Sequence, residues 1–279
     1  DVGDLTYPYN SLNGDIQNIK DITEDNHEIS KLIKDANKPL IILGQSALSS
    51  NSSKYIFESI KSFLIKNNKI SSEWNSLNVI SEDASTVGSF DLGLYKTFDG
   101  SNEILKDLEN NKFEIVYLLG QDNLKFKKKD EFIIYQGSHG DKGAEIADII
   151  LPAAAYTEQN GYFTNLEGKL QKAYKASYPP EEAKEDWLII NELAEIMNHR
   201  KLFNDKDELD SSMLNQINLY IEKNNSKKFT EIKDMNFEKE ILKVTNKDYY
   251  HSNVISRSSK TMIECKSAKI NFKSTGTEG

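Results

Sequence analysis

Short, continuous apolar runs alternate with segments of helical periodicity over the first two thirds of the chain. The run at 40–43 reads Leu-Ile-Ile-Leu, ends at Gly44, and precedes a helical pattern over residues 49–65. Runs without a polar face are typical of strands covered on both sides, and parallel strands need a crossover between them. The alternation therefore predicts an α/β fold, in which a mostly parallel sheet is flanked by helices.

The same reasoning places further elements along the chain. Strands are predicted over 77–80, 113–119, 132–135 and 147–151, with a short helix over 102–111. After Pro179 and Pro180, one helical stripe runs from Trp187 to Met197, and we expect this helix to dock on the sheet. A second amphipathic stretch covers 209–221, and a polar segment over 222–233 is interpreted as a linker. The result is an α/β domain with a helical C-terminal extension.

Charge and composition exclude several classes of function. The chain has 35 basic and 44 acidic residues, a net charge of −9, which disfavours binding to nucleic acid. Its apolar runs are far shorter than the roughly 20 residues needed to span a bilayer, so no direct membrane insertion is expected. Cys265 is the single cysteine, and one thiol forms neither an internal disulfide nor a cysteine-ligated cluster within the chain.

A nucleophilic serine is one candidate for catalysis. Ser46 follows a predicted strand and precedes a helix, and Asp91 or Asp122 and then His139 follow in the order used by α/β-hydrolases. The sharp turn of that class needs a second glycine where Leu48 stands. A plain strand-to-helix turn at Ser46 is therefore the favoured interpretation.

The turn over 137–143 contains three glycines and a nearby His–Asp pair. His139 could act there as a base or a metal ligand. Glycine-rich turns also form for conformational reasons alone, and a histidine that hydrogen-bonds within its own loop is the stronger reading. Neither Gly44 nor Gly120 begins a dinucleotide- or triphosphate-binding glycine motif.

The most specific pattern lies over 147–171. It reads A-D-x-x-L-P, then E, then G-x-x-x-N-x-E-G-[RK]-x-Q. In physical terms, a strand stopped by a proline leads into a small-residue turn and a glycine-punctuated loop. The motif residues are Asp148, Pro152, Glu158, Gly161, Asn165, Glu167 and Gly168.

This pattern resembles the molybdopterin oxidoreductase superfamily. Within it, the chain is similar to the family of large iron–sulfur subunits, of the 75 kDa type, of NADH:quinone oxidoreductase, respiratory complex I. Further matching segments lie at 43–48, 135–144, 179–187 and 255–265. They occur in order over nearly the whole chain. The resemblance implies three parts: a cofactor-free molybdopterin oxidoreductase-like α/β domain over 1–200, a helical segment and linker over 201–248, and a docking tail over 249–279.

The resemblance also implies a division of labour. Such a subunit passes electrons from NADH, via FMN and iron–sulfur clusters, to quinone, coupled to proton translocation. The 4Fe-4S and 2Fe-2S clusters belong to a cysteine-rich N-terminal part, which we expect upstream of Asp1. Residues 1–279 would then be a structural and interface portion that is not itself catalytic. The resemblance implies that residues 1–279 bind no cofactor and that the motif residues serve the architecture of the fold.

The same family sets expectations for partners and location. The partners are other subunits of the hydrophilic arm, and the subunit is peripheral. It would lie on the cytoplasmic side of a bacterial plasma membrane or the matrix side of the mitochondrial inner membrane. The alternative is the C-terminal portion of a molybdopterin-binding oxidoreductase of the formate dehydrogenase or nitrate reductase type. Such an enzyme should continue into a β-barrel domain, whereas the segment after Gln171 turns to helices.

Overall fold

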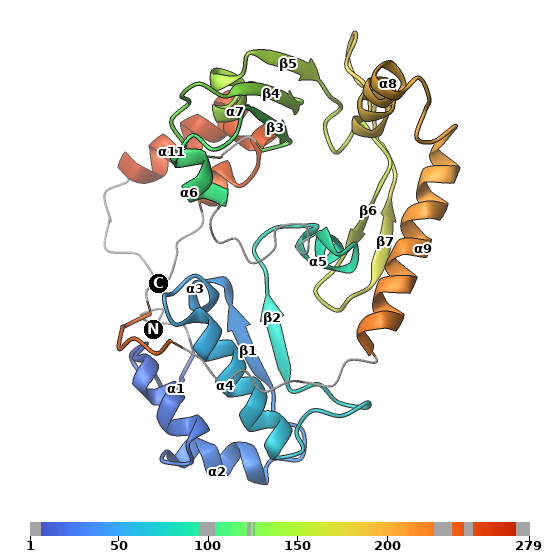
Figure 1. The fold of residues 1–279 in the computed structure, drawn as a ribbon. Helices are drawn as coiled ribbons and strands as arrows, with labels where there is room; N and C mark the ends of the chain where they lie inside the picture. The colour runs from blue at the N-terminus through green and yellow to red at the C-terminus, as the bar shows by residue number, and fades with distance from the viewer. Residues whose placement is uncertain are drawn as a thin grey trace. The chain divides into compact units, whose positions relative to one another are not determined.

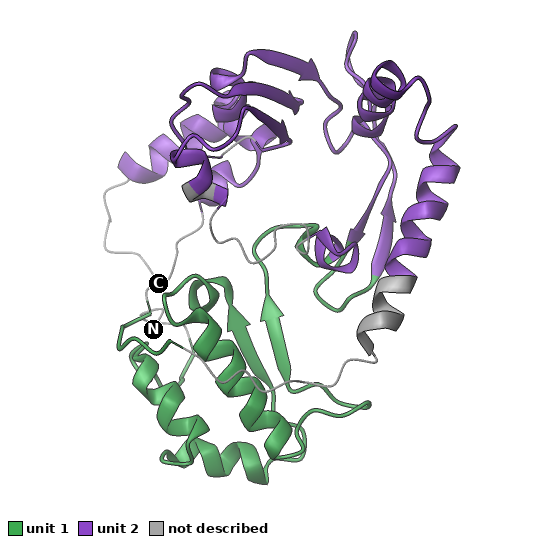
Figure 2. Cartoon of the chain, viewed as in Figure 1, with its two compact units in different colours: residues 1–87, 164–169, 223–246 green, residues 88–163, 170–222, 247–279 purple. Residues whose placement is uncertain are grey.

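The computed structural model describes residues 7–94, 104–121, 124, 126–225, 236–242 and 248–271. The chain forms two compact units, each assembled from segments that are distant in sequence (Figure 2). Unit 1 comprises residues 1–87, 164–169 and 223–246. Unit 2 comprises residues 88–163, 170–222 and 247–279. The C-terminal third of the chain therefore contributes to both units.

Unit 1 is built on two parallel strands, β1 (Ile41–Gly44) and β2 (Leu77–Ile80), in which Ile41 pairs with Leu77 (Figure 1). The apolar stripe of a long helix, α4 (Ser53–Lys66), buries Ile56, Ile60, Phe63 and Leu64. These side chains form one core with Leu43 and Leu77. The remaining helices of this unit are α1 (Ile16–Thr23), α2 (Glu28–Asp35) and α3 (Gln45–Leu48).

Unit 2 contains a three-stranded, fully parallel sheet in the order β3-β4-β5. Its strands are β3 (Ile115–Leu119), β4 (Phe132–Gly137) and β5 (Ile149–Pro152). Leu118, Ile133 and Tyr135 are buried on one face, and partly buried side chains of α7 (Lys142–Ile146) pack against them. Parallel strands flanked by helices in both units confirm the predicted fold class.

The other elements of unit 2 are short strands and helices. They are α6 (Ile104–Glu109), β7 (Leu170–Ala173), α8 (Asp186–Asn198), η2 (Tyr249–His251), α10 (Val254–Ser258) and α11 (Lys260–Asn271). Three elements cross the boundary between the units along the chain: α5 (Thr86–Asp91), β6 (Gly161–Thr164) and α9 (Lys206–Asn225). No helix within the described residues combines the length and apolarity that crossing a membrane requires.

The structure corrects the interpretation of the glycine-punctuated segment after Pro152 as a loop. Strands β6 and β7 pair there, and the five residues between them are too few for a parallel crossover, so they form a hairpin. Tyr162, Phe163 and Thr164 are good strand formers, and the glycines on either side obscured them.

Two predicted helices also have different bounds. The helix expected over 49–65 begins later, as α4 at Ser53, and the short helix α3 precedes it, with a turn over residues 49–52 between the two. The polar segment expected over 222–233 is helical as far as Asn225, where α9 ends, and its residues 226–233 lie outside the described ranges.

Candidate functional site

A cavity of about 290 Å³ lies where strands β4 and β5 end. Gly137 ends β4 and Pro152 ends β5, and both line it. The carboxyl ends of parallel strands are where open α/β sheets bind ligands, so this is the candidate site. The described residues that line the cavity are Gly137, Ser138, His139, Pro152, Ala153, Glu158, Pro180, Glu181, Glu182 and Ala183.

The turn after β4 is held by contacts within itself. A Cβ atom on Gly137 would lie 2.1 Å from the hydroxyl oxygen of buried Tyr135, which explains the glycine. The same hydroxyl donates a hydrogen bond to the backbone oxygen of His139 at 3.0 Å, and the His139 Nδ1 lies 2.9 Å from Ser138 Oγ. These contacts support the interpretation of His139 as a residue that hydrogen-bonds within its own loop.

A buried polar network lies beside this turn. Tyr117 donates its hydroxyl proton to Gln136 Oε1 at 2.5 Å, and Gln136 Nε2 donates to Asp186 Oδ1 at 2.7 Å. The other carboxylate oxygen of Asp186 accepts from Gln159 Nε2 at 2.8 Å. Burial, together with the negative charge of Asp186, raises the pKa of Tyr117. The network connects β3, β4, the turn after β5 and the first residue of α8.

Neither Gln136 nor Gln159 is among the site residues that the sequence predicts. The position of Gln136 inside an otherwise apolar strand could have indicated a polar network, because a buried amide needs hydrogen-bond partners. In the structure its side chain is fully buried. Its partner Asp186 is 50 positions away along the chain, so local patterns do not reveal the pair.

Asp148 lies at the opposite end of β5 from the cavity. Its Oδ2 accepts a hydrogen bond from the Ile133 backbone at 2.8 Å, and its Oδ1 pairs with Lys128 at 2.5 Å. The hydrogen bond from Ile133 and the ammonium of Lys128 lower the pKa of Asp148. Asp148 thus holds the beginning of β4 against the beginning of β5.

Two of the other motif residues reach the cavity. Pro152 ends β5, and its carbonyl accepts a hydrogen bond from the Lys184 backbone at 3.3 Å. Glu158 closes the turn that follows β5: its Oε2 accepts from the Ala155 backbone at 2.9 Å, and its own N–H donates to the Ala155 carbonyl at 2.9 Å. The carboxylate of Glu158 therefore has a partner inside its own turn.

The remaining motif residues belong to the β6-β7 hairpin and do not line the cavity. Gly161 begins β6. Asn165 Oδ1 accepts from the backbones of Glu167 at 3.0 Å and Lys169 at 2.9 Å, which closes the hairpin turn. Gly168 has φ +80°, a left-handed conformation that strongly favours glycine. The Glu167 side chain is exposed.

The cavity lining does not fit a molybdopterin. That cofactor carries an anionic phosphate, which proteins bind with cationic side chains or groups of backbone N–H donors. The described lining instead contributes three carboxylates, Glu158, Glu181 and Glu182, and neither lysine nor arginine. No group of three potential metal-ligating side chains occurs among the described residues.

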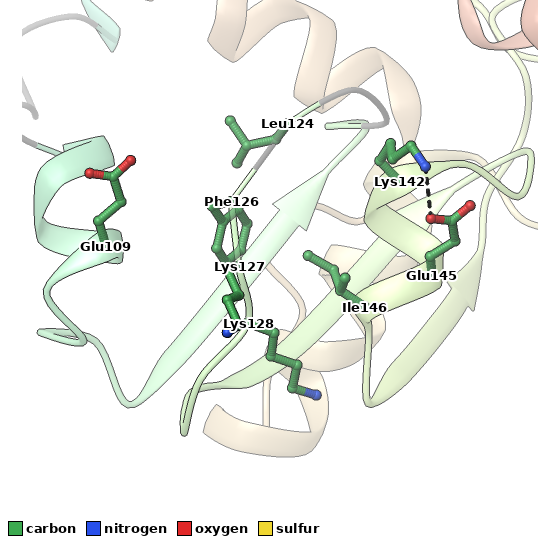
Figure 3. A pocket seen from close by; sticks show the side chains of 8 residues that line it. All are labelled: Glu109, Leu124, Phe126, Lys127, Lys128, Lys142, Glu145 and Ile146. Atoms are coloured by element: carbon green, nitrogen blue, oxygen red, sulfur yellow. Dashed lines mark hydrogen bonds and ion pairs between the residues drawn. The ribbon is translucent and has the colours of Figure 1, made fainter.

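A second hollow of unit 2, of about 770 Å³, is lined by residues of α6, of α7 and of the segment between β3 and β4 (Figure 3). Leu124, Phe126 and Ile146 supply its apolar surface, and they also pack on the core of the sheet. Lysines and glutamates surround these side chains. Lys142 forms an ion pair with Glu145 at 3.0 Å, and the ammonium of Lys128 forms one with Asp148. This nearly balanced charge favours no substrate class.

Candidate residues of the hydrolase hypothesis are divided between the two units. Ser46 lies in α3 of unit 1, whereas Asp91 and His139 belong to unit 2. Asp122 lies outside the described residues.

Residues 236–271 contribute to both units. In unit 1, Ser52 exchanges two hydrogen bonds with the backbone of Glu238. In unit 2, Arg257 Nε donates to Asp141 Oδ2 at 2.5 Å. Burial raises the pKa of Asp141, but the Arg257 guanidinium and the Lys142 backbone N–H outweigh that effect and lower it below its usual value.

Comparison with known proteins gives two family matches. Residues 1–196 match the family model described as molybdopterin oxidoreductase. Residues 220–265 match the model for the C-terminal part of the G subunit of NADH-ubiquinone oxidoreductase.

Individual relatives are similar over nearly the whole chain. The NADH-ubiquinone oxidoreductase 75 kDa subunit of Reclinomonas americana is 36% identical over 278 residues, which cover 94% of this chain and 39% of that protein. The G subunit of the NADH-quinone oxidoreductase of Rickettsia bellii is 38% identical over 275 residues, covering 97% of this chain and 39% of that protein. The sequence thus spans about two fifths of the length of these relatives.

Proposed function

The chain belongs to the molybdopterin oxidoreductase family, and from this premise we propose that residues 1–279 are a structural portion of the large iron–sulfur subunit of an NADH:quinone oxidoreductase. The subunit passes electrons from NADH, via FMN and iron–sulfur clusters, to quinone, and this transfer is coupled to proton translocation. In the proposal, residues 1–279 support that electron path and form subunit contacts, while the clusters belong to a further part of the longer subunit.

The observation that carries the proposal is the way the second family match is built into the fold. Residues 220–265 match a model specific to the G subunit of this oxidoreductase. Their described parts contact both units: Glu238 is bonded to Ser52 in unit 1, and Arg257 is paired with Asp141 in unit 2. A segment with such contacts is integral to the α/β units, which favours the complex I subunit over other members of the superfamily.

The chemistry of the candidate cavity supports a role without a pterin. Its carboxylates would repel an anionic cofactor phosphate. One oxygen of the Glu158 carboxylate is engaged inside its own turn, where it accepts the Ala155 N–H. We therefore propose that Asp148, Pro152 and Glu158 serve the architecture of the sheet and its turn, and that Gly161, Asn165, Glu167 and Gly168 do so for the hairpin.

The finer organisation is part of the same proposal. The three parts predicted from the sequence, 1–200, 201–248 and 249–279, belong to this proposal; the end of the molybdopterin oxidoreductase match at residue 196 supports the first boundary, and the second match, 220–265, spans the second boundary. The proposed partners are other subunits of the hydrophilic arm, with no nucleic acid and no direct insertion into the bilayer. The proposed location is peripheral, on the cytoplasmic side of a bacterial plasma membrane or the matrix side of the mitochondrial inner membrane.

Purification of the longer subunit from its own cells tests the proposal. With an affinity tag on this subunit, we expect NADH:quinone oxidoreductase activity to co-purify, with iron and without molybdenum by elemental analysis. Stoichiometric molybdenum would instead assign the protein to the molybdopterin-binding oxidoreductases of the formate dehydrogenase or nitrate reductase type. Absence of the quinone-reducing activity from the purified material would also refute the proposal.

A pair of variants tests the role of the C-terminal segment. Arg257→Ala removes the ion pair with Asp141 and should reduce the amount of assembled complex, while the iron content of the subunit stays unchanged. Lys260→Ala removes an exposed cation three residues further along and should assemble normally. Equal assembly of the two variants would show that the Arg257 contact does not matter for the interface.

A further inference from the structure

Residues 236–242, which we call the strap, lie across the beginnings of α1 and α4 within unit 1. Ile241 forms an antiparallel bridge with Asp15, the N-cap of α1. The Ile16 N–H, at the first helical position of α1, donates to the Glu240 carbonyl at 3.2 Å. The strap is thus hydrogen-bonded into unit 1, although it comes from a distant part of the sequence.

The beginning of α4 lacks the local pair of side chains that usually caps a helix. In a capping box, the N-cap serine accepts from the N–H of the third helical residue, and a glutamate or glutamine at that third position accepts from the N-cap N–H. Ser52 is the N-cap of α4, and the third helical residue is Tyr55, which has neither a carboxylate nor an amide. The Ser52 side chain makes no capping bond to α4, all of whose residues are described.

The strap supplies both missing halves of the box. Glu240 Oε1 accepts from the Ser52 N–H at 3.1 Å, which is the bond that a glutamate at the third helical position would make. The Ser52 Oγ accepts from the Glu238 N–H at 2.9 Å instead of from a helix N–H. Glu238 Oε2 also accepts from Asn51 Nδ2 at 3.0 Å. These carboxylates lie at the positive end of the α4 dipole, where the first turn contains Lys54 and no acidic residue.

We propose that the strap is the cap of α4, and that docking of the strap and formation of the first turn of α4, residues 53–56, are one cooperative event. This turn contains Ile56, which is fully buried in the core of unit 1. Tyr55 in the same turn packs on Phe237 of the strap, with ring centroids 4.9 Å apart. Release of the strap therefore frays the helix where it enters the core, and fraying of the helix removes the surface on which the strap lies.

The two halves of this device come from the two family matches. The helix α4 lies inside the match to molybdopterin oxidoreductase, residues 1–196. The strap lies inside the match to the C-terminal part of the G subunit, residues 220–265. Part of the α/β fold therefore depends on a segment that matches a G-subunit model. The coupling is a property of unit 1 and stands apart from the electron-transfer role proposed for the longer subunit.

Glu240→Ala in the full-length subunit tests the capping, with amide hydrogen exchange resolved to single residues. Two amides are followed: the Ile56 N–H, which donates to the Ser52 carbonyl at 2.9 Å, and the Leu242 N–H, which is bonded to the loop before α1. Loss of a helix cap should accelerate both exchange rates by about 2- to 30-fold. Lys239→Ala is the matched control, because it changes a neighbouring exposed side chain, and should leave both rates within about twofold.

A pair of variants at Lys54 tests the reverse direction. Lys54 is an exposed residue in the first turn of α4. Relative to Lys54→Ala, Lys54→Gly weakens the helix and should accelerate exchange of the Ile56 N–H roughly fivefold. Because coupling is reciprocal, the Leu242 N–H in the strap should be accelerated by about the same factor. Glu240→Gln keeps an acceptor oxygen and should retain more protection at both amides than Glu240→Ala.

Independent responses would overturn the inference. They are a Glu240→Ala variant that accelerates Leu242 but not Ile56, or equal Leu242 exchange in the two Lys54 variants. If the variants fail to accumulate, exchange of the unsubstituted subunit in low concentrations of urea decides the question. Ile56 and Leu242 should then converge on one opening free energy and one m-value, as one cooperative unit does, and two distinct openings refute the coupling.

Discussion

Ser52 should control how firmly residues 236–242 are held in unit 1. Its side chain is fully buried at the beginning of α4. Its Oγ accepts a hydrogen bond from the Glu238 N–H at 2.9 Å and donates one to the Glu238 carbonyl at 3.1 Å. Ser52→Ala therefore leaves both backbone groups of Glu238 without their partner while it changes the packing volume little.

The magnitude follows from these two lost bonds. Each hydrogen bond contributes about 0.5–1.5 kcal/mol net, so the loss of both costs about 1–3 kcal/mol. Since about 1.4 kcal/mol corresponds to a factor of ten, the equilibrium for release of residues 236–242 should shift by roughly 5- to 160-fold. The Ser52 backbone N–H keeps its own bond to Glu240 Oε1 at 3.1 Å, so the effect is confined to the lost side chain.

Amide hydrogen exchange measures this release directly. The Ile16 N–H donates to the Glu240 carbonyl at 3.2 Å, and the Leu242 N–H donates to the Gly14 carbonyl at 2.8 Å. Both amides become accessible when the segment leaves α1. Their exchange should accelerate by the stated factor in Ser52→Ala, while amides in the middle of α4 change less.

Ser49→Ala is the matched control. Its hydroxyl is exposed and donates to the carbonyl of Gln45, one turn earlier. This substitution should leave the exchange of Ile16 and Leu242 within a factor of about two, as expected of a surface change. Equal exchange in the two variants would refute the reasoning, and would assign the anchoring to Phe237, which packs on Tyr55 with ring centroids 4.9 Å apart.

Three further predictions concern unit 2. Gly143→Ala should lower the free energy of unfolding by about 1–3 kcal/mol in thermal denaturation, because the new Cβ would lie 2.7 Å from the Gln121 carbonyl oxygen. Gly140→Ala, with no atom within 4 Å of the added carbon, should change it by less than about 0.5 kcal/mol. Asp141→Asn keeps an N-cap side chain for α7 but removes the charge that pairs with Arg257, so trypsin should cleave after Arg257 faster than in the unsubstituted protein. Because the pKa of Asp141 is lowered in the fold, its stabilising contribution is complete above the unfolded value of about 3.9 and is lost as pH falls through the lower folded value. Pepsin cleavage within 248–271 should therefore increase below about pH 4, and a step of equal size in Asp141→Asn would contradict this assignment.

Local sequence patterns were sufficient for the parallel strands. Each strand is a run of apolar residues that ends in a turn signal, as at 40–44, so its position is encoded within a few residues. The β6-β7 hairpin was missed because its strands are four residues long and contain polar side chains, and the glycines of the surrounding motif are equally compatible with a loop.

The contacts that organise the candidate site are of a different kind. Gln136 meets Asp186 across 50 positions, and Asp141 meets Arg257 across 116. Each partner taken alone is an ordinary polar residue on a strand, turn or helix. Only the tertiary fold brings them together, so no local pattern in a single sequence contains the pairing.

The apolar pattern of the strands predicts their positions better than the exposure of their side chains. A parallel strand with one side in water should alternate apolar and polar residues, whereas β3 and β4 are apolar at successive positions. The pattern predicts cover on both faces, whereas among the described residues of unit 2 Ile133 is fully buried and Phe132 and Ile149 are exposed. A run of successive apolar residues therefore locates a parallel strand along the chain, but it does not give the burial of each side chain, because burial depends on tertiary contacts that a local pattern does not contain.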